Sequence, residues 1–199
     1  MDVQERLRQA ITVEAEAVRG LLDQIDQSYV EAVNLLQGCR GKVVVTGVGK
    51  SGIIGKKMAA SFASTGTPAF FVHSTEAAHG DSGMIGKDDV VILVSNSGET
   101  AEVLNVIPIL DQIGSKRISI TSNHNSSLAK AADVSIAYDY AREADHLNLA
   151  PTTSATLTLV IGDALAVTLS TLRGFTEADF HRYHPGGSLG AKLSEVKDV

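Results

Sequence analysis

The sequence predicts an α/β protein: a three-layer αβα sandwich around a five-stranded parallel sheet, preceded by N-terminal helices. Short apolar runs such as 43–45 and 90–94 alternate with stretches of helical periodicity, the pattern of strands connected by helices. These runs are continuous rather than alternating, as expected for parallel strands buried on both faces. The chain has 199 residues, 44% of them hydrophobic, which suits a single core.

The N-terminal residues 2–37 are predicted to be helical, because Leu7, Ile11 and other apolar residues recur at three- and four-residue steps. We expect segment 1–38 to pack on the core or on a neighbouring subunit, and 39–199 to form the main domain. The elements expected after it are strands at 43–45, 69–72, 90–94, 117–120 and 134–136, and helices at 51–64, 101–113 and 152–172.

The stretch 152–172 is apolar enough to be mistaken for a membrane span. It is rich in Thr, Ser, Ala and Gly and contains Asp163, whereas spans need about twenty predominantly apolar residues. We interpret it as a helix packed between other elements. Asp163 is then expected to be paired or at an interface, because an unpaired buried carboxylate is costly, and no membrane partner is expected.

The stretches predicted to be irregular are 73–88, 121–127, 138–150 and 181–190. The first three directly follow strands and, together with the fourth, hold most of the histidines. Ligands of open α/β sheets bind beyond the carboxyl ends of the strands. The sequence therefore predicts a ligand site formed by these loops.

The net charge of −6 argues against general nucleic-acid binding. It also means that a phosphorylated ligand must be held by local geometry, because the overall field repels it. The single cysteine, Cys39, excludes an internal disulfide. With a charged N-terminal stretch that does not resemble a signal peptide, this favours a cytoplasmic location.

Two polar segments follow predicted strands and precede helices. In GVGKSG, residues 47–52, the glycines let the backbone turn tightly and approach a ligand. This segment fits neither a dinucleotide fingerprint, which needs an acidic residue after the second strand, nor a Walker loop. In VSNSGET, residues 94–100, hydroxyls cluster where a helix begins, which is typical of phosphate binding. The alternative is that Ser97 only caps the helix and Asn96 forms a turn.

These segments resemble the SIS (sugar isomerase) domains, and within them the arabinose-5-phosphate isomerases of the KpsF/GutQ type. The motifs follow the family's order and cover nearly the whole chain. The resemblance implies a flavodoxin-like or Rossmann-like SIS fold. The segments that carry it are GVGKSG (47–52), HSTEAAHGD (73–81), SNSGET (95–100), NLAPTTSAT (148–156) and YHPGGSLG (183–190).

The resemblance implies an aldose–ketose isomerase that interconverts D-ribulose 5-phosphate and D-arabinose 5-phosphate through an enediolate, without metal or organic cofactor. A small phosphosugar and further copies of the chain, in a tetramer, are the implied partners. The residues expected to bind phosphate are Gly49, Ser51, Ser95, Asn96, Ser97 and Thr100. The residues expected to line the reacting end are Lys50, His79, Glu102, Glu143 and His184.

The residue types suit this reaction. Carboxylates and histidines transfer protons well, and a lysine or histidine can stabilise the developing oxyanion. We assign the C1/C2 base to Glu102, with Glu143 as the rival. His184 is assigned to ring opening or proton shuttling, and in these domains it may come from a neighbouring subunit.

Other interpretations stay open. Glu102, Glu143 and His79 could be ordinary solvated residues, and His73, His79 and His184 could bind zinc, although their spacing matches no compact metal motif. The protein could instead be a phosphosugar sensor, or an isomerase of another phosphosugar. Many relatives continue into two CBS modules, and no control by such modules is expected in this chain. Asp145 and His146 replace a family segment beside Glu143, which bears on sugar specificity.

Overall fold

Five parallel strands form one sheet in the order β2-β1-β3-β4-β5. The computed structural model, which describes residues 2–184, confirms the predicted fold class. The direction in which strands are added reverses between β1 and β3, since β2 lies on one side of β1 while β3, β4 and β5 lie on the other. The strands are β1 (Val43–Gly47), β2 (Ala69–His73), β3 (Val90–Val94), β4 (Lys116–Thr121) and β5 (Val134–Ala137).

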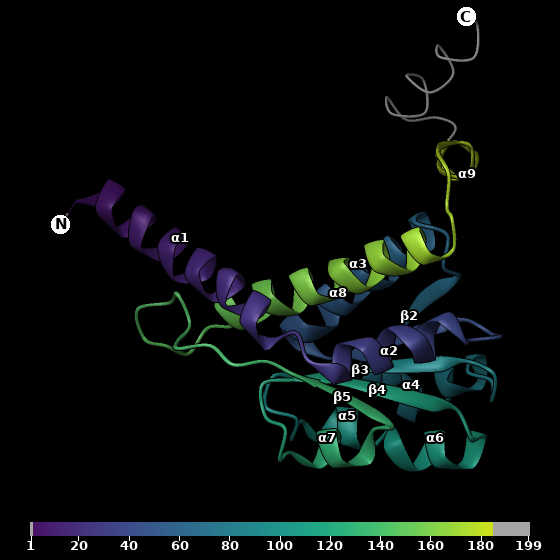
Figure 1. Cartoon of the computed structure of the whole chain (residues 1–199). Helices are drawn as coiled ribbons and strands as arrows, with labels where there is room; N and C mark the ends of the chain where they lie inside the picture. The colour runs from purple at the N-terminus through teal and green to yellow at the C-terminus, as the bar shows by residue number, and fades with distance from the viewer. Residues whose placement is uncertain (1, 185–199) are drawn as a thin grey trace, which may run out of the picture.

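The strands are buried on both faces, as the continuous apolar runs predict. Val43 and Val45 of β1 belong to one core cluster, whereas Val44 belongs to the other. Helices α2 (Gln27–Gln37), α3 (Gly49–Ser64) and α8 (Thr153–Leu172) cover the first face (Figure 1). The second face is covered by α4 (Ser74–Ala78), α5 (Ala101–Leu104), α6 (Ile107–Ile113) and α7 (Ser127–Ala131).

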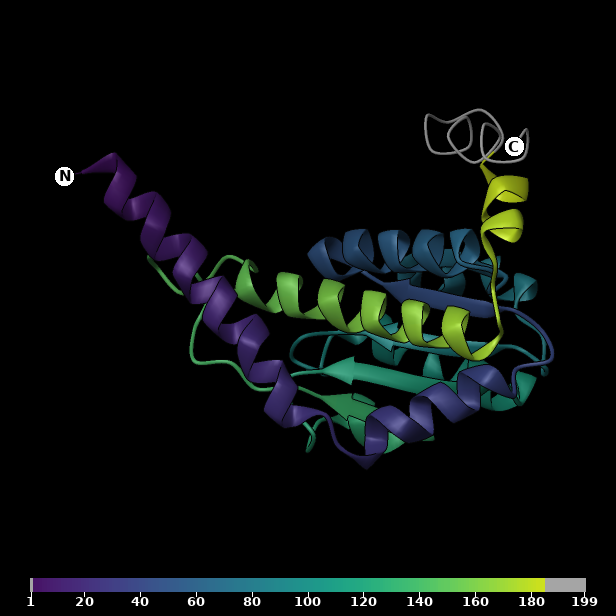
Figure 2. The same cartoon turned by 45° about the horizontal axis from the view of Figure 1, so that its top comes forward.

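The N-terminal region forms two α-helices, in agreement with the prediction of N-terminal helices. A short 3-10 helix, η1 (Leu21–Gln24), follows α1 (Val3–Gly20), and the Asp26 side chain accepts a hydrogen bond from the Ser28 N–H at the start of α2. Helix α1 has no buried residue, and its N-terminal part extends away from the body (Figures 1 and 2). Its C-terminal part packs on α8 and the core, through Ala17 and Val18. Helix α2 instead supplies core side chains.

The Gln24 side chain pairs with the backbone just beyond β5. Its amide nitrogen donates to the Asp139 carbonyl at 3.1 Å, and its amide oxygen accepts from the Asp139 N–H at 2.7 Å. This pair attaches the end of η1 to the edge of the sheet.

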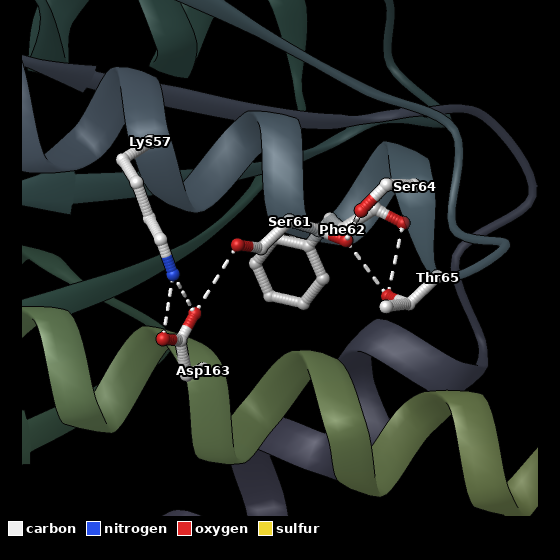
Figure 3. A network of polar contacts seen from close by, with 6 residues as sticks. All are labelled: Lys57, Ser61, Phe62, Ser64, Thr65 and Asp163. Carbon is white, nitrogen blue, oxygen red and sulfur yellow. Dashed lines mark hydrogen bonds and ion pairs between the residues drawn. The ribbon is translucent and has the colours of Figure 1, made fainter. Parts of the chain in front are cut away.

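Helices α3 and α8 pack closely together. Gly162 of α8 lies against Met58 of α3, where an added Cβ would come within 2.6 Å of the methionine Cε. Lys57 pairs with Asp163, which also accepts from the Ser61 hydroxyl at 3.2 Å (Figure 3). The predicted pairing of Asp163 is therefore confirmed.

By length and composition, α8 is the one helix of residues 2–184 that could cross a membrane. Such a composition is also that of a core helix, and the Leu157–Leu169 face of α8 is buried in the core beside the sheet. The expectation of a helix packed between other elements is confirmed.

Several boundaries differ from prediction. The expected helix 101–113 breaks at Asn105–Val106, because Pro108 lies in the first turn of α6 and starts a new helix there. The stretch 73–88 contains α4 and a 3-10 helix, η2 (Asp81–Met84), and 181–183 end α9 (Glu177–Tyr183). A capping box between Thr176 and Asp179 starts α9.

Candidate functional site: an anion cradle between two strands

The loops after β1 and β3 lie side by side. Gly47 at the end of β1 is in register with Val94 at the end of β3, so GVGKSG and SNSGET leave the same edge of the sheet. This is the point at which the strand order reverses, where open α/β sheets bind ligands. The structure thus brings the two predicted phosphate segments together.

One half of the cradle is the start of α3. Gly49 has a left-handed φ of +57°, and the N-cap residue Val48 provides no side-chain hydrogen bond. The first N–H groups of this 16-residue helix therefore lack an intrahelical partner and a cap, and they form the positive end of the helix dipole. Gly52 keeps this start close to β1, since a Cβ there would lie 2.9 Å from the Gly47 carbonyl oxygen.

The other half is a ring of hydroxyls after β3. The Ser95 hydroxyl, which is buried, lies 2.8 Å from that of Thr100 and accepts from the Gly98 N–H at 3.1 Å. The Ser97 hydroxyl accepts from the Glu99 N–H at 3.1 Å. Within residues 2–184, the N–H groups of Asn96, Ser97 and Thr100 have no backbone or side-chain acceptor, which leaves them available to an anion.

Gly98 is required by this geometry. Its φ is +68°, and an added Cβ would lie 2.1 Å from the Ser126 hydroxyl. The residue that caps the next helix is Thr100 rather than Ser97, and α5 has only four residues. On this side, local N–H groups rather than a helix dipole are therefore the groups available to an anion.

The Asn96 side chain is committed to neighbours other than a ligand. Its Oδ1 accepts from the Tyr138 hydroxyl at 2.9 Å, and its Nδ2 donates to the Tyr140 hydroxyl at 3.0 Å. Its backbone carbonyl accepts from Ser122 and from the Thr121 hydroxyl. The Asn96 backbone N–H and the second Nδ2 hydrogen remain for the predicted phosphate contact.

Glu143 is buried and caps α8. Its Oε1 accepts from the Tyr140 hydroxyl at 3.0 Å, and its Oε2 accepts from the Thr152 N–H at 2.8 Å, the Thr152 hydroxyl at 3.1 Å and the Ser154 N–H at 3.1 Å. Burial acts to raise the pKa of Glu143, but the hydrogen bonds from Ser154, Thr152 and Tyr140 hold that pKa below the ordinary glutamate value. The carboxylate is therefore ionised at neutral pH.

Three other predicted residues are exposed beside the cradle. Lys50 and Glu102 lie in the first turns of α3 and α5, and His79 ends α4, which packs on α5. No hydrogen bond or ion pair joins these three side chains to another residue in the described part of the chain. They are available to a substrate.

His184 lies at the opposite end of the molecule. It follows α9, beyond the C-terminus of α8, whose 20 residues span about 30 Å (Figure 2). Its ring stacks on Phe180 with centroids 4.0 Å apart, and Nδ1 is 2.9 Å from the Phe180 carbonyl. One chain does not bring His184 to the cradle, and the predicted turn at Pro185–Gly187 lies outside the described residues.

Two groups of site residues were missed by sequence reasoning. Tyr138 and Tyr140 hold Asn96 and Glu143, and Thr152 and Ser154 donate to Glu143. The available signal was a pair of tyrosines two residues apart, directly after a strand. For the zinc alternative, residues 2–184 show no group of three His, Cys, Asp or Glu side chains placed to hold a metal ion.

Comparisons with known proteins show the family of the chain. The model of the SIS domain family matches residues 35–168. Arabinose 5-phosphate isomerase KdsD of Pseudomonas aeruginosa is 52% identical over 200 residues, covering all of this chain and 61% of that protein. The protein of the same name from Escherichia coli K12 is 53% identical over 199 residues, with the same two coverages.

A solved structure of an Escherichia coli CFT073 protein in complex with arabinose 5-phosphate superimposes with a TM-score of 0.90 at 52% identity, covering 93% of this chain and 100% of that one. The chain spans about three fifths of the length of the curated relatives it matches.

Proposed function

The chain belongs to the SIS domain family, and from this premise we propose that it is an isomerase that interconverts D-ribulose 5-phosphate and D-arabinose 5-phosphate. The observation that carries the proposal is the cradle between β1 and β3, where an uncapped helix start faces a ring of hydroxyls. The names of the curated relatives and the solved complex with the aldose phosphate support the choice of sugar.

The cradle binds the phosphate without a dedicated arginine. Unpaired N–H groups at the start of α3 and in the Ser95–Thr100 loop donate to the phosphate oxygens, together with the hydroxyls of Ser51, Ser97 and Thr100. Local dipoles of this kind offset the repulsion expected from a net charge of −6.

Glu102 serves as the base in this proposal. Starting from the ketose, it takes a proton from C1, the electron pair of that C–H bond forms the C1=C2 bond of an enediolate, and negative charge develops on O2. The proton then returns to C2, while a second proton passes from O1 to O2 to leave the aldose. Lys50 and His79 stabilise the oxyanion by donating hydrogen bonds. This route uses no metal or organic cofactor.

The geometry favours Glu102 over Glu143 as the base. Both oxygens of Glu143 already accept hydrogen bonds, and its lowered pKa makes it a weak proton acceptor. Glu102 is exposed beside the cradle and has no competing partner among the described residues.

The assembly proposed is a homotetramer in the cytoplasm. Val3, Leu7 and Ile11 form an exposed apolar stripe along α1, which a second copy would cover. His184 is about the length of α8 away from its own cradle, so we assign its contribution to a neighbouring subunit's site. Light scattering should give the mass of four chains, and a monomer mass at micromolar concentration would contradict this. The cytoplasmic location stays a prediction.

The activity is tested by incubating the protein with ribulose 5-phosphate in deuterated water. NMR should show deuterium incorporation at C1 together with formation of arabinose 5-phosphate. Glu102→Gln should lower kcat by about 100-fold or more, whereas Glu31→Gln on the exposed face of α2 should not change it. Tight binding without exchange would favour a sensor, and turnover of other phosphosugars alone would favour another isomerase.

A further inference from the structure

A continuous chain of hydrogen bonds connects the hydroxyl loop to the start of α8. It runs from Asn96 Nδ2 to the Tyr140 hydroxyl, and from there to Glu143 Oε1, with both distances at 3.0 Å. Glu143 Oε2 continues it to the N–H groups of Thr152 and Ser154. Among the described residues, Tyr140 is the one whose side chain bonds both Asn96 and Glu143.

The direction of each bond in this chain is fixed by chemistry. An ionised carboxylate can only accept, so the Tyr140 hydroxyl must donate to Glu143 and accept from Asn96. This sets the orientation of the Asn96 amide, whose oxygen then faces the Tyr138 donor. Successive bonds that point toward a negative charge reinforce one another.

Through α8, this series of hydrogen bonds is connected to the start of α3, which is the other half of the cradle. Glu143 fixes the start of α8, and α8 packs along α3 through the Gly162–Met58 contact and the Lys57–Asp163 pair (Figure 3). Helix α3 begins with Gly49–Ser51. The two halves of the cradle are thus connected by β1–β3 pairing and also through α8, which Tyr140 reaches by way of Glu143 and Tyr138 reaches by way of Thr158.

We propose that Tyr140 is a positioning residue, whose hydroxyl sets the spacing between the Ser95–Thr100 loop and the start of α8, and through α8 the shape of the phosphate cradle. Tyr140 touches no reacting atom in this role. The coupling between the Ser95–Thr100 loop and the start of α8 is inferred from the hydrogen bonds alone. Its effect on substrate binding rests on the proposed function.

The coupling is tested in the absence of ligand by amide hydrogen exchange of Tyr140→Phe. Exchange should quicken by about tenfold at the bonded N–H groups of both Gly98 and Thr152, because Asn96 and Glu143 each lose a partner. Tyr138→Phe should quicken Gly98 but not Thr152, since the Tyr138 hydroxyl bonds Asn96, Thr158 and the Ser154 carbonyl but not Glu143. Tyr29→Phe is the control, because its buried hydroxyl has no partner in the described chain. Unchanged exchange at Gly98 in Tyr140→Phe would overturn the proposal.

The functional effect is tested on the same variants. Tyr140→Phe should raise both the KM for ribulose 5-phosphate and the Kd for inorganic phosphate about tenfold, while kcat falls less than threefold. Asn96→Ala is the second variant and should act in the same direction. A fall in kcat with unchanged phosphate affinity would rule out a positioning role. Absence of turnover in the wild type would refute the proposed function but not the exchange result.

Discussion

Helices α3 and α8 lie side by side and begin at the same end of the molecule, yet the N–H groups of their first turns have different partners. The start of α8 is occupied by the protein's own carboxylate, Glu143, which accepts from Thr152 and Ser154. The start of α3 has neither a carboxylate nor a side-chain cap. A helix N-terminus attracts an anion in either case. The anion at the start of α8 is therefore part of the fold, whereas we propose that a ligand supplies the anion at the start of α3.

The largest loss of stability should come from removing the Glu143 carboxylate. Glu143→Ala leaves the Thr152 and Ser154 N–H groups and the Tyr140 hydroxyl without their acceptor, which should cost about 3 kcal/mol. For a chain of this size the melting temperature should fall by about 6–12 °C. Glu102→Gln is the matched control and should leave the melting temperature unchanged. An equal loss in both variants would remove the distinction between the two carboxylates.

A carboxylate introduced at the start of α3 should compete with phosphate there. Val48→Asp places a carboxylate at the N-cap of α3, where it competes with phosphate for the same N–H groups. Calorimetry should show the Kd for inorganic phosphate rising at least tenfold, about 1.4 kcal/mol. Val48→Asn, with the same shape but no charge, should cost less affinity. Unchanged phosphate binding in Val48→Asp would place the anion elsewhere.

Lowering the pH should reduce the stabilisation that ionised Glu143 gives to the start of α8. Because the pKa of Glu143 is lowered in the folded state, its contribution is complete above the ordinary glutamate pKa and is lost as the pH falls through the lowered value. The melting temperature of the wild type should therefore exceed that of Glu143→Gln near pH 7, and the gap should narrow below about pH 4. A gap that is constant between pH 7 and pH 3 would contradict an ionised cap.

The smallest effect is expected where the two helices are tied together at the surface. Lys57 and Asp163 form an ion pair between α3 and α8 (Figure 3), but their side chains are 46% and 42% exposed. Solvent screening should limit the loss in Lys57→Met to about 0.5 kcal/mol. Thermal unfolding should detect a change of about 2 °C or less. A loss as large as that of Glu143→Ala would show that this pair, and not the cap, fixes α8.

The sheet was predictable because its strands are continuous apolar runs. The run 90–94 matches β3, and the Gly-rich and Ser-rich segments after β1 and β3 lie together as the strand-edge rule requires. The break between α5 and α6 was missed although Pro108 marks a helix start. The start of α9 had a signal as well, since Thr176 and Asp179 have the spacing of a capping box.

The side-chain partners in the site were harder to predict. Asn96 was expected at the phosphate because it lies among hydroxyls, but its amide bonds two tyrosines more than forty positions away in the chain. Glu143 was considered as a base, and its capping of a helix nine residues later depends on the path of the loop. The spacing of residues in the sequence does not show which way side chains point in such loops. His184 is separated from the cradle by the length of α8, which no motif indicated.

The pairing of Gln24 with Asp139 affects the edge of the sheet at β5. β5 is an outermost strand, and the backbone beyond it would ordinarily offer an unsatisfied donor and acceptor to any passing extended chain. The Gln24 carboxamide imitates a peptide group and engages both. An extended chain from another molecule therefore cannot pair with the Asp139 backbone while Gln24 occupies it.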